Sequence, residues 1–340
     1  MARNTYGLDL GSYEIKVYDK KKDNIWKEKN VIAIKDQRDI FAVGDTAYGM
    51  YQKAPSNIEV IFPMKGGVIS RFNNMQFLLQ NLLKQGRQFA RGSEYVIAVP
   101  TDVTEVEKKA FFDLVIHSTA RAKEVNIVER SIADAIGLDL DVQNTKGLFI
   151  ANFGAETTEL SILAGGGMIL NRLIKLGGTA YDESIVDLVR HSHDFLIGRQ
   201  TAEILRKRFG VFTGETDAAL SVAGRDLITG VPMRKTVSYT LVRAALRDPL
   251  LECVRAIHSL LDRTPPEVRK AVSANGIFLT GGMAQMPGLE TYIKKAVGIP
   301  VRTAAEPDIC VVKGLEKIIN SKELGKLAYS MLNESYRWMR

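Results

Sequence analysis

The chain has 340 residues, 46% hydrophobic and 25% charged, a composition typical of a soluble globular protein large enough for two lobes. It has no apolar run of the roughly 18–20 residues that cross a bilayer, no apolar secretory signal and only two isolated cysteines, which together favour a reducing cytoplasm. The net charge of +7 is spread along the chain, and without zinc-finger spacing or an RNP-like aromatic run we expect no nucleic-acid partner.

The N-terminal part predicts a hairpin, a small subdomain and then alternating helices and strands. The expected elements are strands at 6–10, 15–18 and 24–26, a small inserted subdomain over 30–69, a helix around 75–83, a strand at 95–99, a helix at 106–116 and a strand at 125–128.

The C-terminal part begins with a second hairpin and continues mainly as helices. The expected elements are strands at 147–152 and 158–163, helices over most of 181–270, a buried strand at 276–280 and a helix beginning near Pro287. Alternating strands and helices with a hairpin at each start indicate an α/β fold with mixed sheets.

The two hairpins share one sequence plan. Asp9-Leu10-Gly11-Ser12 and Asn152-Phe153-Gly154-Ala155 each place an Asp or Asn, an apolar residue, a Gly and a small residue after an apolar strand. The two copies are too far apart for a solenoid repeat, so they indicate two related halves.

Each of these glycine turns is a candidate phosphate site. A turn without a Cβ lets backbone N–H groups approach an anion, and Asp9 and Asn152 at the strand ends would hold a hydrated Mg²⁺ that neutralises the phosphates. The alternative is that both are plain turns without chemistry.

Two further segments have the residue types of a nucleotide site. Thr280-Gly281-Gly282-Met283 ends a buried strand in bare backbone on which a base or phosphate can lie, although it can equally be a simple strand-to-helix turn. Glu203 and Arg206 share one helical face and suit ribose hydroxyls and a nucleoside, although such a pair is often only a surface ion pair.

In this order, the motifs resemble those of the actin, chaperone-ATPase and sugar-kinase superfamily, and the chain is similar to the MreB family from about residue 5 to 318. The segments that carry the closer likeness are 57–69, 99–107, 176–183, 224–232 and 298–301. The resemblance implies an actin-like, duplicated ribonuclease H-like fold with two lobes, four subdomains and a central nucleotide cleft. It implies subdomain IA at 1–29, 70–145 and 319–340, IB at 30–69, IIA at 146–180 and 255–318, and IIB at 181–254.

The same resemblance implies ATP and Mg²⁺ as cofactors. The nucleotide-binding residues that follow from it are Asp9, Gly11, Ser12, Tyr13, Asn152, Gly154, Ala155, Glu156, Thr157, Glu203, Arg206, Gly281, Gly282 and Met283, with Asp9 on Mg²⁺ through water and Thr157 also as a catalytic candidate. It further implies a head-to-tail filament of two protofilaments on the inner face of the cell membrane, with membrane proteins of the wall-elongation machinery as partners and a role in cell shape.

The departures from the family pattern fall in the catalytic parts. The second hairpin has Asn152-Phe153-Gly154-Ala155-Glu156-Thr157 where the family has Asp-Ile-Gly-Gly-Gly-Thr, and Glu156 brings negative charge towards phosphates. Where the family places a water-positioning Glu before Pro, this chain has Arg130-Ser131, with Glu129 one residue early. We therefore expect nucleotide binding with slow hydrolysis, unless the register shifts and Glu129 takes the catalytic role.

Two segments are candidates for membrane contact. Phe89 lies between Arg87 and Arg91, where some family members present apolar residues to lipid, although an ordinary loop explains it as well. The aromatic and basic segment 327–340 suits either an interfacial helix or packing on the first lobe.

Three other functions remain open at this stage. A small-molecule kinase needs a general base facing a substrate, for which the sequence offers no further placed carboxylate. A chaperone-type ATPase needs a substrate-binding domain that the chain does not contain. A nucleotide-independent scaffold descended from an actin is favoured by the departures at 130 and 152–156.

Overall fold

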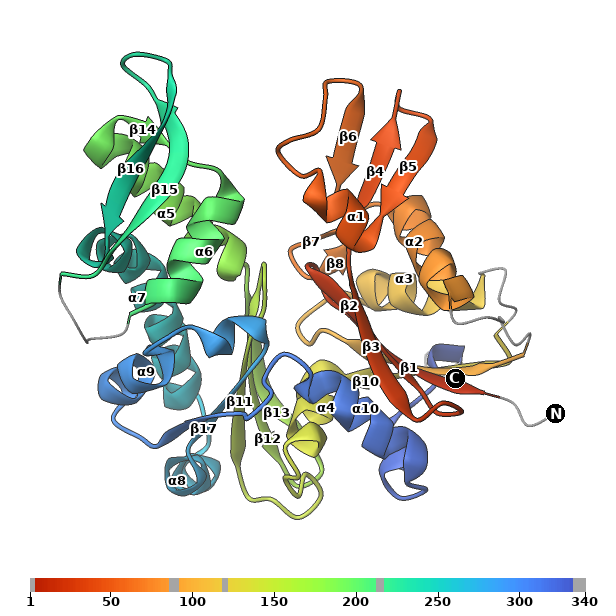
Figure 1. Ribbon diagram of the computed structural model, residues 1–340. Helices are drawn as coiled ribbons and strands as arrows, with labels where there is room; N and C mark the ends of the chain where they lie inside the picture. Colours follow the sequence, from red (N-terminus) through yellow and green to blue (C-terminus); the bar gives the residue numbers. More distant parts are fainter. Residues whose placement is uncertain (1–3, 86–91, 118–121, 212–216, 333–340) are drawn as a thin grey trace. The chain divides into compact units, whose positions relative to one another are not determined.

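The computed structural model describes residues 4–85, 92–117, 122–211 and 217–332, and the chain divides into two compact units (Figure 1). The first unit comprises Met1–Asn144, Gly166–Met168 and Ile309–Arg340, and the second comprises Thr145–Gly165 and Ile169–Asp308.

The first unit is built on a five-stranded mixed sheet with the order β10-β9-β1-β2-β3. Its elements are β1 (Thr5–Leu10), β2 (Glu14–Asp19), β3 (Asn24–Lys29), β4 (Ile32–Lys35), β5 (Asp39–Val43), α1 (Gly44–Gly49), β6 (Ile58–Ile61), β7 (Met64–Lys65), β8 (Val68–Ile69), α2 (Phe72–Gln85), β9 (Glu94–Val99), α3 (Glu105–Ile116), β10 (Glu124–Glu129), α4 (Arg130–Gly137), α10 (Cys310–Asn320) and the 3₁₀ turn η2 (Leu324–Leu327). The predicted hairpin at its start is confirmed, with Asp9 opposite Lys16 in the antiparallel β1–β2 pair.

The two faces of this sheet are covered by different helices. Leu8 and Leu10 lie in a buried apolar cluster with residues of α2 and α3. Because side chains alternate along a strand, Gly7 and Asp9 face the other side, where Leu315 of α10 lies against Gly7. Asp9 therefore lies on the face that α4 and α10 cover.

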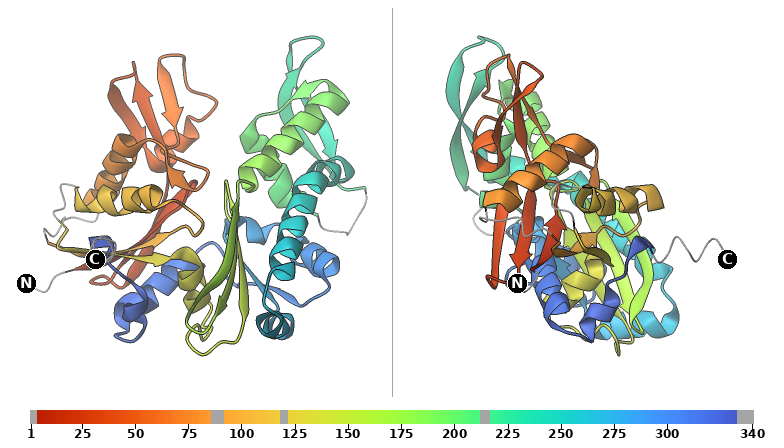
Figure 2. Two further views of the ribbon diagram at one scale, coloured as in Figure 1. Left: turned by 180° about the vertical axis from the view of Figure 1, so that it is seen from behind. Right: turned by 90° about the vertical axis from the view of Figure 1, so that its right-hand side faces the viewer.

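Helices α4 and α10 pack with their backbones in close contact (Figure 2). A Cβ at Gly314 would fall on the carbonyl oxygen of Ala133, and one at Gly137 would fall on that of Cys310. Because of this packing, residues 309–318 belong to the first unit, whereas the sequence boundaries grouped them with 255–308.

A second small sheet within the first unit is formed by β5-β4-β6. Val31, Ala33 and Ala47 form its buried centre together with α1. This compact piece occupies the segment in which the sequence shows short apolar runs between turn formers.

The second unit contains a five-stranded sheet with the order β13-β12-β11-β17-β18 and a three-stranded sheet with the order β14-β15-β16. Its elements are β11 (Leu148–Phe153), β12 (Thr158–Ala164), β13 (Gly167–Ile174), α5 (Gly178–His193), β14 (Phe195–Leu196), α6 (Arg199–Phe209), β15 (Ala219–Asp226), β16 (Pro232–Ser238), α7 (Tyr239–Asp262), α8 (Pro266–Asn275), β17 (Ile277–Thr280), the 3₁₀ turn η1 (Gly282–Gln285), α9 (Leu289–Val297) and β18 (Val301–Thr303).

The two large sheets have the same plan. In each, the first hairpin is antiparallel and its leading strand pairs in parallel with a strand from later in the same half, β1 with β9 and β11 with β17. The strand orders match when one is reversed, which confirms the duplication that the two glycine turns predict.

One predicted element is wrong in part, and the start of another is now located. Residues 219–238 form the hairpin β15–β16 and not helix, because their buried and exposed residues alternate with the period of a half-buried strand. The helix expected near Pro287 begins at Leu289, since Gly288 takes a left-handed conformation at φ 80° and a separate 3₁₀ turn precedes it.

Candidate functional site

The first glycine turn closes tightly between β1 and β2. Gly11 donates its backbone N–H to the Glu14 carbonyl at 3.1 Å, and a Cβ at Gly11 would lie only 2.7 Å from that oxygen. A side chain at this position is therefore excluded, and Ser12 and Tyr13 form the turn itself.

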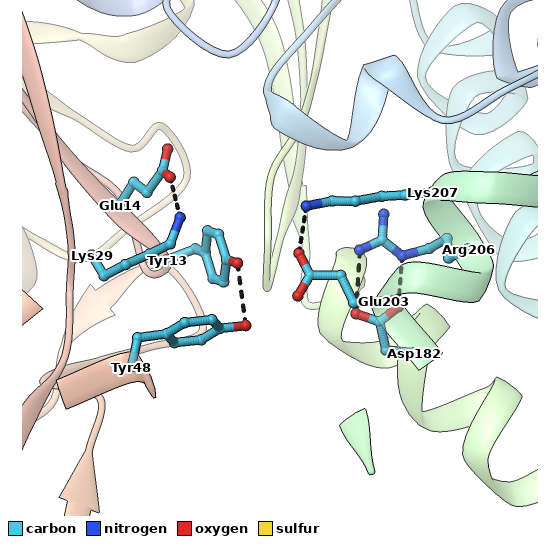
Figure 3. Close-up of polar contacts among 8 residues, drawn as sticks. All are labelled: Tyr13, Glu14, Lys29, Tyr48, Asp182, Glu203, Arg206 and Lys207. Carbon is cyan, nitrogen blue, oxygen red and sulfur yellow. Dashed lines mark hydrogen bonds and ion pairs between the residues drawn. The ribbon is translucent and has the colours of Figure 1, made fainter. Parts of the chain in front are cut away.

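Tyr13 connects this turn to the small β4–β6 sheet. Its hydroxyl donates to that of Tyr48 in α1 at 3.2 Å, with the rings edge to face at 5.4 Å (Figure 3). Lys29 lies 4.2 Å from the centre of the Tyr13 ring and forms an ion pair with Glu14. Tyr48 and Lys29, both in the same unit as the turn, therefore hold Tyr13 in place.

Asp9 lies between two cationic side chains. Its Oδ2 is 3.5 Å from Lys16 Nζ, and its Oδ1 is 3.8 Å from Arg130 Nε. These side chains are 12% and 9% exposed and that of Asp9 is 7% exposed, so water screens the three charges only weakly.

This environment does not fit the Mg²⁺ that the resemblance implies. Mg²⁺ is held through carboxylates whose negative charge it can share, usually with several waters. The Asp9 carboxylate already faces two positive charges, and the described residues contain no group of three or more His, Cys, Asp and Glu side chains arranged for a metal. Asp9, one of the two residues that the sequence predicts as holding Mg²⁺, is therefore already paired with cations.

Glu129 and Arg130 lie at the junction of β10 and α4 and have different partners. Arg130 is the first residue of α4, is buried and lies near Asp9. Glu129 precedes the helix and accepts a hydrogen bond from the Tyr329 hydroxyl at 2.9 Å. Adjacent positions at a strand end thus direct the carboxylate and the guanidinium to different groups, as the sequence spacing predicts.

The second glycine turn joins β11 to β12. Gly154 donates its N–H to the Thr157 carbonyl at 2.8 Å, and Thr157 is buried. A Cβ at Gly177 would lie 2.6 Å from the backbone of Ala155, Glu156 and Thr157. Only a glycine at 177 lets the start of α5 approach the turn this closely.

Helix α5 is tied to this turn by its first N–H groups. Gly178 donates to the Gly154 carbonyl at 3.1 Å, and Thr179 donates to the Ala155 carbonyl at 2.7 Å. Two of the N–H groups at the N-terminus of α5 therefore donate to the turn, and these hydrogen bonds fix the shape of the turn.

The Gly281–Met283 segment lies beside Asn152 in the same unit. A Cβ at Gly281, where φ is 82°, would fall on the Phe153 carbonyl oxygen and lie 2.7 Å from Asn152 Oδ1. Gly282 begins η1, and Met283 in the same turn is buried. The structure thus brings together Asn152, the 154–157 turn and Gly281–Met283, all of which the sequence marks as candidates.

Arg206 forms a buried ion pair with Asp182 of α5. Its Nε and Nη2 donate to the two carboxylate oxygens at 2.7 and 3.2 Å (Figure 3). Glu203 instead pairs with Lys207 at 2.7 Å, so Glu203 and Arg206 do not form the surface pair considered from the sequence. Burial raises the pKa of the Asp182 carboxyl, against the opposing effect of Arg206.

Arg206 also lies beside the start of α5. A Cβ at Gly178 would be 3.2 Å from its Nη2. The guanidinium therefore positions the helix whose first residues hold the 154–157 turn, and its expected contact with a nucleoside remains a prediction.

The sequence motifs do not include Lys16, Asp182 and Gly177, which the structure places beside the predicted site residues. The position of Lys16 could be predicted from the sequence, because the length of the turn fixes the register of the hairpin and places Lys16 opposite Asp9. The partnership of Asp182 with Arg206 joins two helices and has no local sequence signature.

The candidate membrane segments are only partly described. Phe89 lies outside the described residues, as do 333–340 at the end of the chain. Tyr329 exchanges two backbone hydrogen bonds with Ile127, at 2.8 and 3.0 Å, so the beginning of the C-terminal segment packs on the first unit. No helix within the described residues has the length and apolar character needed to cross a membrane.

Two large mixed sheets of one plan, each with a glycine turn after its leading strand, define an actin-like α/β fold. The family model for the MreB/Mbl protein matches residues 3–326. The chain belongs to the MreB/Mbl family.

Known proteins agree with this assignment. The cell shape-determining protein MreB of Escherichia coli strain K12 is 34% identical over 323 residues, which covers 92% of each chain. The crystal structure of MreB5 of Spiroplasma citri bound to ADP matches with a TM-score of 0.89 at 26% identity, over 94% of this chain and 97% of that one. The MamK double helical filament matches with a TM-score of 0.79 at 21% identity, over 94% and 99%, which supports the fold alone.

Proposed function

We propose that this chain is an ATP-binding cytoskeletal protein that assembles into head-to-tail filaments on the inner face of the cell membrane. In this role it organises the membrane proteins of wall elongation and so contributes to cell shape. Nucleotide acts as the switch for assembly, and hydrolysis is slow.

The observation that carries nucleotide binding is the pair of glycine turns. Each turn closes by one N–H···O bond, at 3.1 Å for Gly11 and 2.8 Å for Gly154. A Cβ at either glycine would make a close contact with a backbone carbonyl oxygen. Bare backbone at the end of a leading strand suits the oxygens of a polyphosphate. The relative MreB5, which has such a fold, was crystallised with ADP and with AMPPNP.

Calorimetric titration of the purified chain with ATP tests nucleotide binding. Saturable binding of about one ATP per chain, with a dissociation constant in the micromolar range or tighter, is the expected result. A chain that gives no binding heat and is not shifted in thermal stability by ATP contradicts the proposal.

Slow hydrolysis follows from the position of Arg130. A guanidinium does not lose its proton, so it cannot act as a base towards water. Glu129, the neighbouring carboxylate, is hydrogen-bonded by Tyr329. We expect phosphate release to be much slower than in a typical bacterial actin and to rise in Arg130→Glu, whereas robust release from the unmodified chain would contradict an impaired site.

A nucleotide-independent scaffold is the second candidate. Its supporting observation is the Asp9–Arg130 contact at 3.8 Å, in which two residues of the expected catalytic site are paired with each other. The ATP titration separates this candidate from the first, because a scaffold would not bind nucleotide.

Membrane association is tested by co-sedimentation with anionic liposomes. The full chain and a chain ending at Leu332 are compared, because this truncation keeps the Tyr329–Ile127 bridge. Loss of binding assigns lipid contact to residues 333–340, which contain Tyr336, Trp338 and two arginines. Equal binding by both chains removes that segment from the proposal.

A further inference from the structure

The turn of the β15–β16 hairpin gathers exposed apolar side chains. Ile228 is 78% exposed, Val231 53% and Leu227 45%, and Met233 near the start of β16 is 41% exposed. In Figure 1 the hairpin leads away from the helices of the second unit, and its turn lies at the end of that unit opposite α8. Apolar side chains gathered on one projecting turn, in contrast to single exposed ones, mark a contact surface.

The backbone N–H groups of this turn have acceptors within the second unit. Asp226 donates to the Val231 carbonyl at 3.0 Å, and Gly230 donates to the Asp226 carbonyl at 2.9 Å. Leu227 donates to the Asp194 carbonyl at 2.8 Å. These hydrogen bonds close the turn on itself and tie it to the residue that ends α5.

The other N–H groups between 226 and 231 are bound by side chains. The Asp226 carboxylate accepts from Ile228 and Thr229 at 3.1 and 2.8 Å, and the Thr229 hydroxyl accepts from Val231 at 3.4 Å. A loop in water does not need acceptors of its own, because water supplies them, whereas a loop in contact with lipid must satisfy its N–H groups internally. The backbone of this turn meets that requirement.

The hairpin carries more positive than negative charge. Its segment 219–238 contains one acidic residue, Asp226, which is 6% exposed and pairs with Lys235 at 2.7 Å. Arg225 and Arg234 are exposed and donate hydrogen bonds to backbone carbonyls at 3.0 and 2.6 Å, and these bonds leave the positive charges in place. Two exposed guanidinium groups therefore lie beside the apolar turn, and they suit an anionic surface.

We propose that this turn is a membrane anchor, in which Leu227, Ile228 and Val231 enter the interface of an anionic lipid bilayer and Arg225 and Arg234 bind its headgroups. Apolar side chains with neighbouring cations are the combination that binds such an interface. Lipid fits this turn better than a second copy of the chain does, because a chain with a net charge of +7 offers no excess of anions to the two arginines. The inference rests on the proposed membrane association and names residues that carry it.

The decisive experiment places an environment-sensitive fluorophore, NBD, on the turn of the full chain. Cys253 and Cys310 are buried, so a thiol-reactive label is directed to Ile228→Cys. We expect its emission to rise and shift to the blue on vesicles of phosphatidylcholine mixed with phosphatidylglycerol, and to respond much less to phosphatidylcholine alone. Ile204→Cys is the matched control, since Ile204 is a 57% exposed isoleucine on α6 of the same unit, and its label should not respond.

Co-sedimentation with the same anionic vesicles measures the contribution of each side chain. Ile228→Gln should weaken binding by about threefold to tenfold, because it removes an apolar group from the interface. Arg234→Gln should weaken it by about fivefold. Ile204→Gln should bind as the unmodified chain does, and ATP binding and thermal unfolding of all three variants should be unchanged, because the replaced side chains are exposed.

The outcomes separate this inference from the proposal that it deepens. If the unmodified chain binds the vesicles while Ile228→Gln binds equally well, or the label at 228 does not respond to them, the inference is overturned and membrane association stands. If the unmodified chain does not bind the vesicles, both are overturned. A response of the label to ATP without vesicles assigns the turn to a second copy of the chain and overturns the lipid assignment.

Discussion

At the scale of single residues, the Asp182–Arg206 pair shows how a buried charge positions a turn without touching it. Two hydrogen bonds join the pair, at 2.7 and 3.2 Å, and the Asp182 side chain belongs to the helix that holds the 154–157 turn. Burial raises the pKa of Asp182, so the carboxylate form is disfavoured by its surroundings and depends on Arg206.

Removal of Arg206 alone should therefore be costly. Arg206→Met leaves a buried carboxylate without its guanidinium and should lower the free energy of unfolding by about 3–5 kcal/mol. The double variant Asp182→Leu/Arg206→Met should recover much of this loss, because no charge is left buried. Urea unfolding of the two single variants and the double variant gives the coupling energy, and additive losses would contradict this account.

At the scale of elements, helices α4 and α10 depend on glycines for their contact. A Cβ at Gly314 would overlap the Ala133 carbonyl oxygen, and the atoms that would have to move belong to the backbone of α4. Gly314→Ala should lower the free energy of unfolding by about 1–3 kcal/mol or more. Gly49→Ala is the control, since no atom lies within 4 Å of its added Cβ, and it should be neutral or slightly stabilising.

The β15–β16 turn is organised by one carboxylate. Asp226 accepts hydrogen bonds from the N–H groups of Ile228 and Thr229 at 3.1 and 2.8 Å and pairs with Lys235 at 2.7 Å. The hydrogen bond from Lys235 and those from Thr229 hold the pKa of Asp226 well below its usual range. The turn should therefore be sensitive to acid.

The direction of the pH dependence of stability follows from the lowered pKa of Asp226. Stability from Asp226 is fully present above the unfolded-state pKa of about 3.9 and is lost as the pH falls through the lower pKa of the folded state. Asp226→Asn keeps an oxygen acceptor but loses the ion pair, so amide exchange of residues 226–231 should be faster than in the unmodified chain at pH 6 and less dependent on pH below 4. An unchanged exchange profile would show that the ion pair does not hold this turn.

Sequence alone predicts the elements whose pattern is local. The two hairpins, the apolar stripe of α2 and the turns at Gly11 and Gly154 follow from spacing within a few residues. The β15–β16 hairpin was missed because its apolar residues are sparse and its pairing is visible only in the folded register. The partners of Asp9 and Arg206 come from other elements, so their charge balance requires the fold.

At the scale of the whole molecule, the duplicated sheets carry unlike residues at matching positions. Where the first hairpin pairs Asp9 with Lys16, the second pairs Asn152 with Glu159. The repeat therefore preserves the turns but not the charges beside them. We expect each turn to recognise phosphate through its own backbone groups.

The central claim is that nucleotide binding controls assembly. Electron microscopy on an anionic lipid monolayer, with and without ATP, tests it most directly. We expect filaments with ATP and none without it. Filaments of equal length and number in both conditions would contradict the switch and support a nucleotide-independent scaffold.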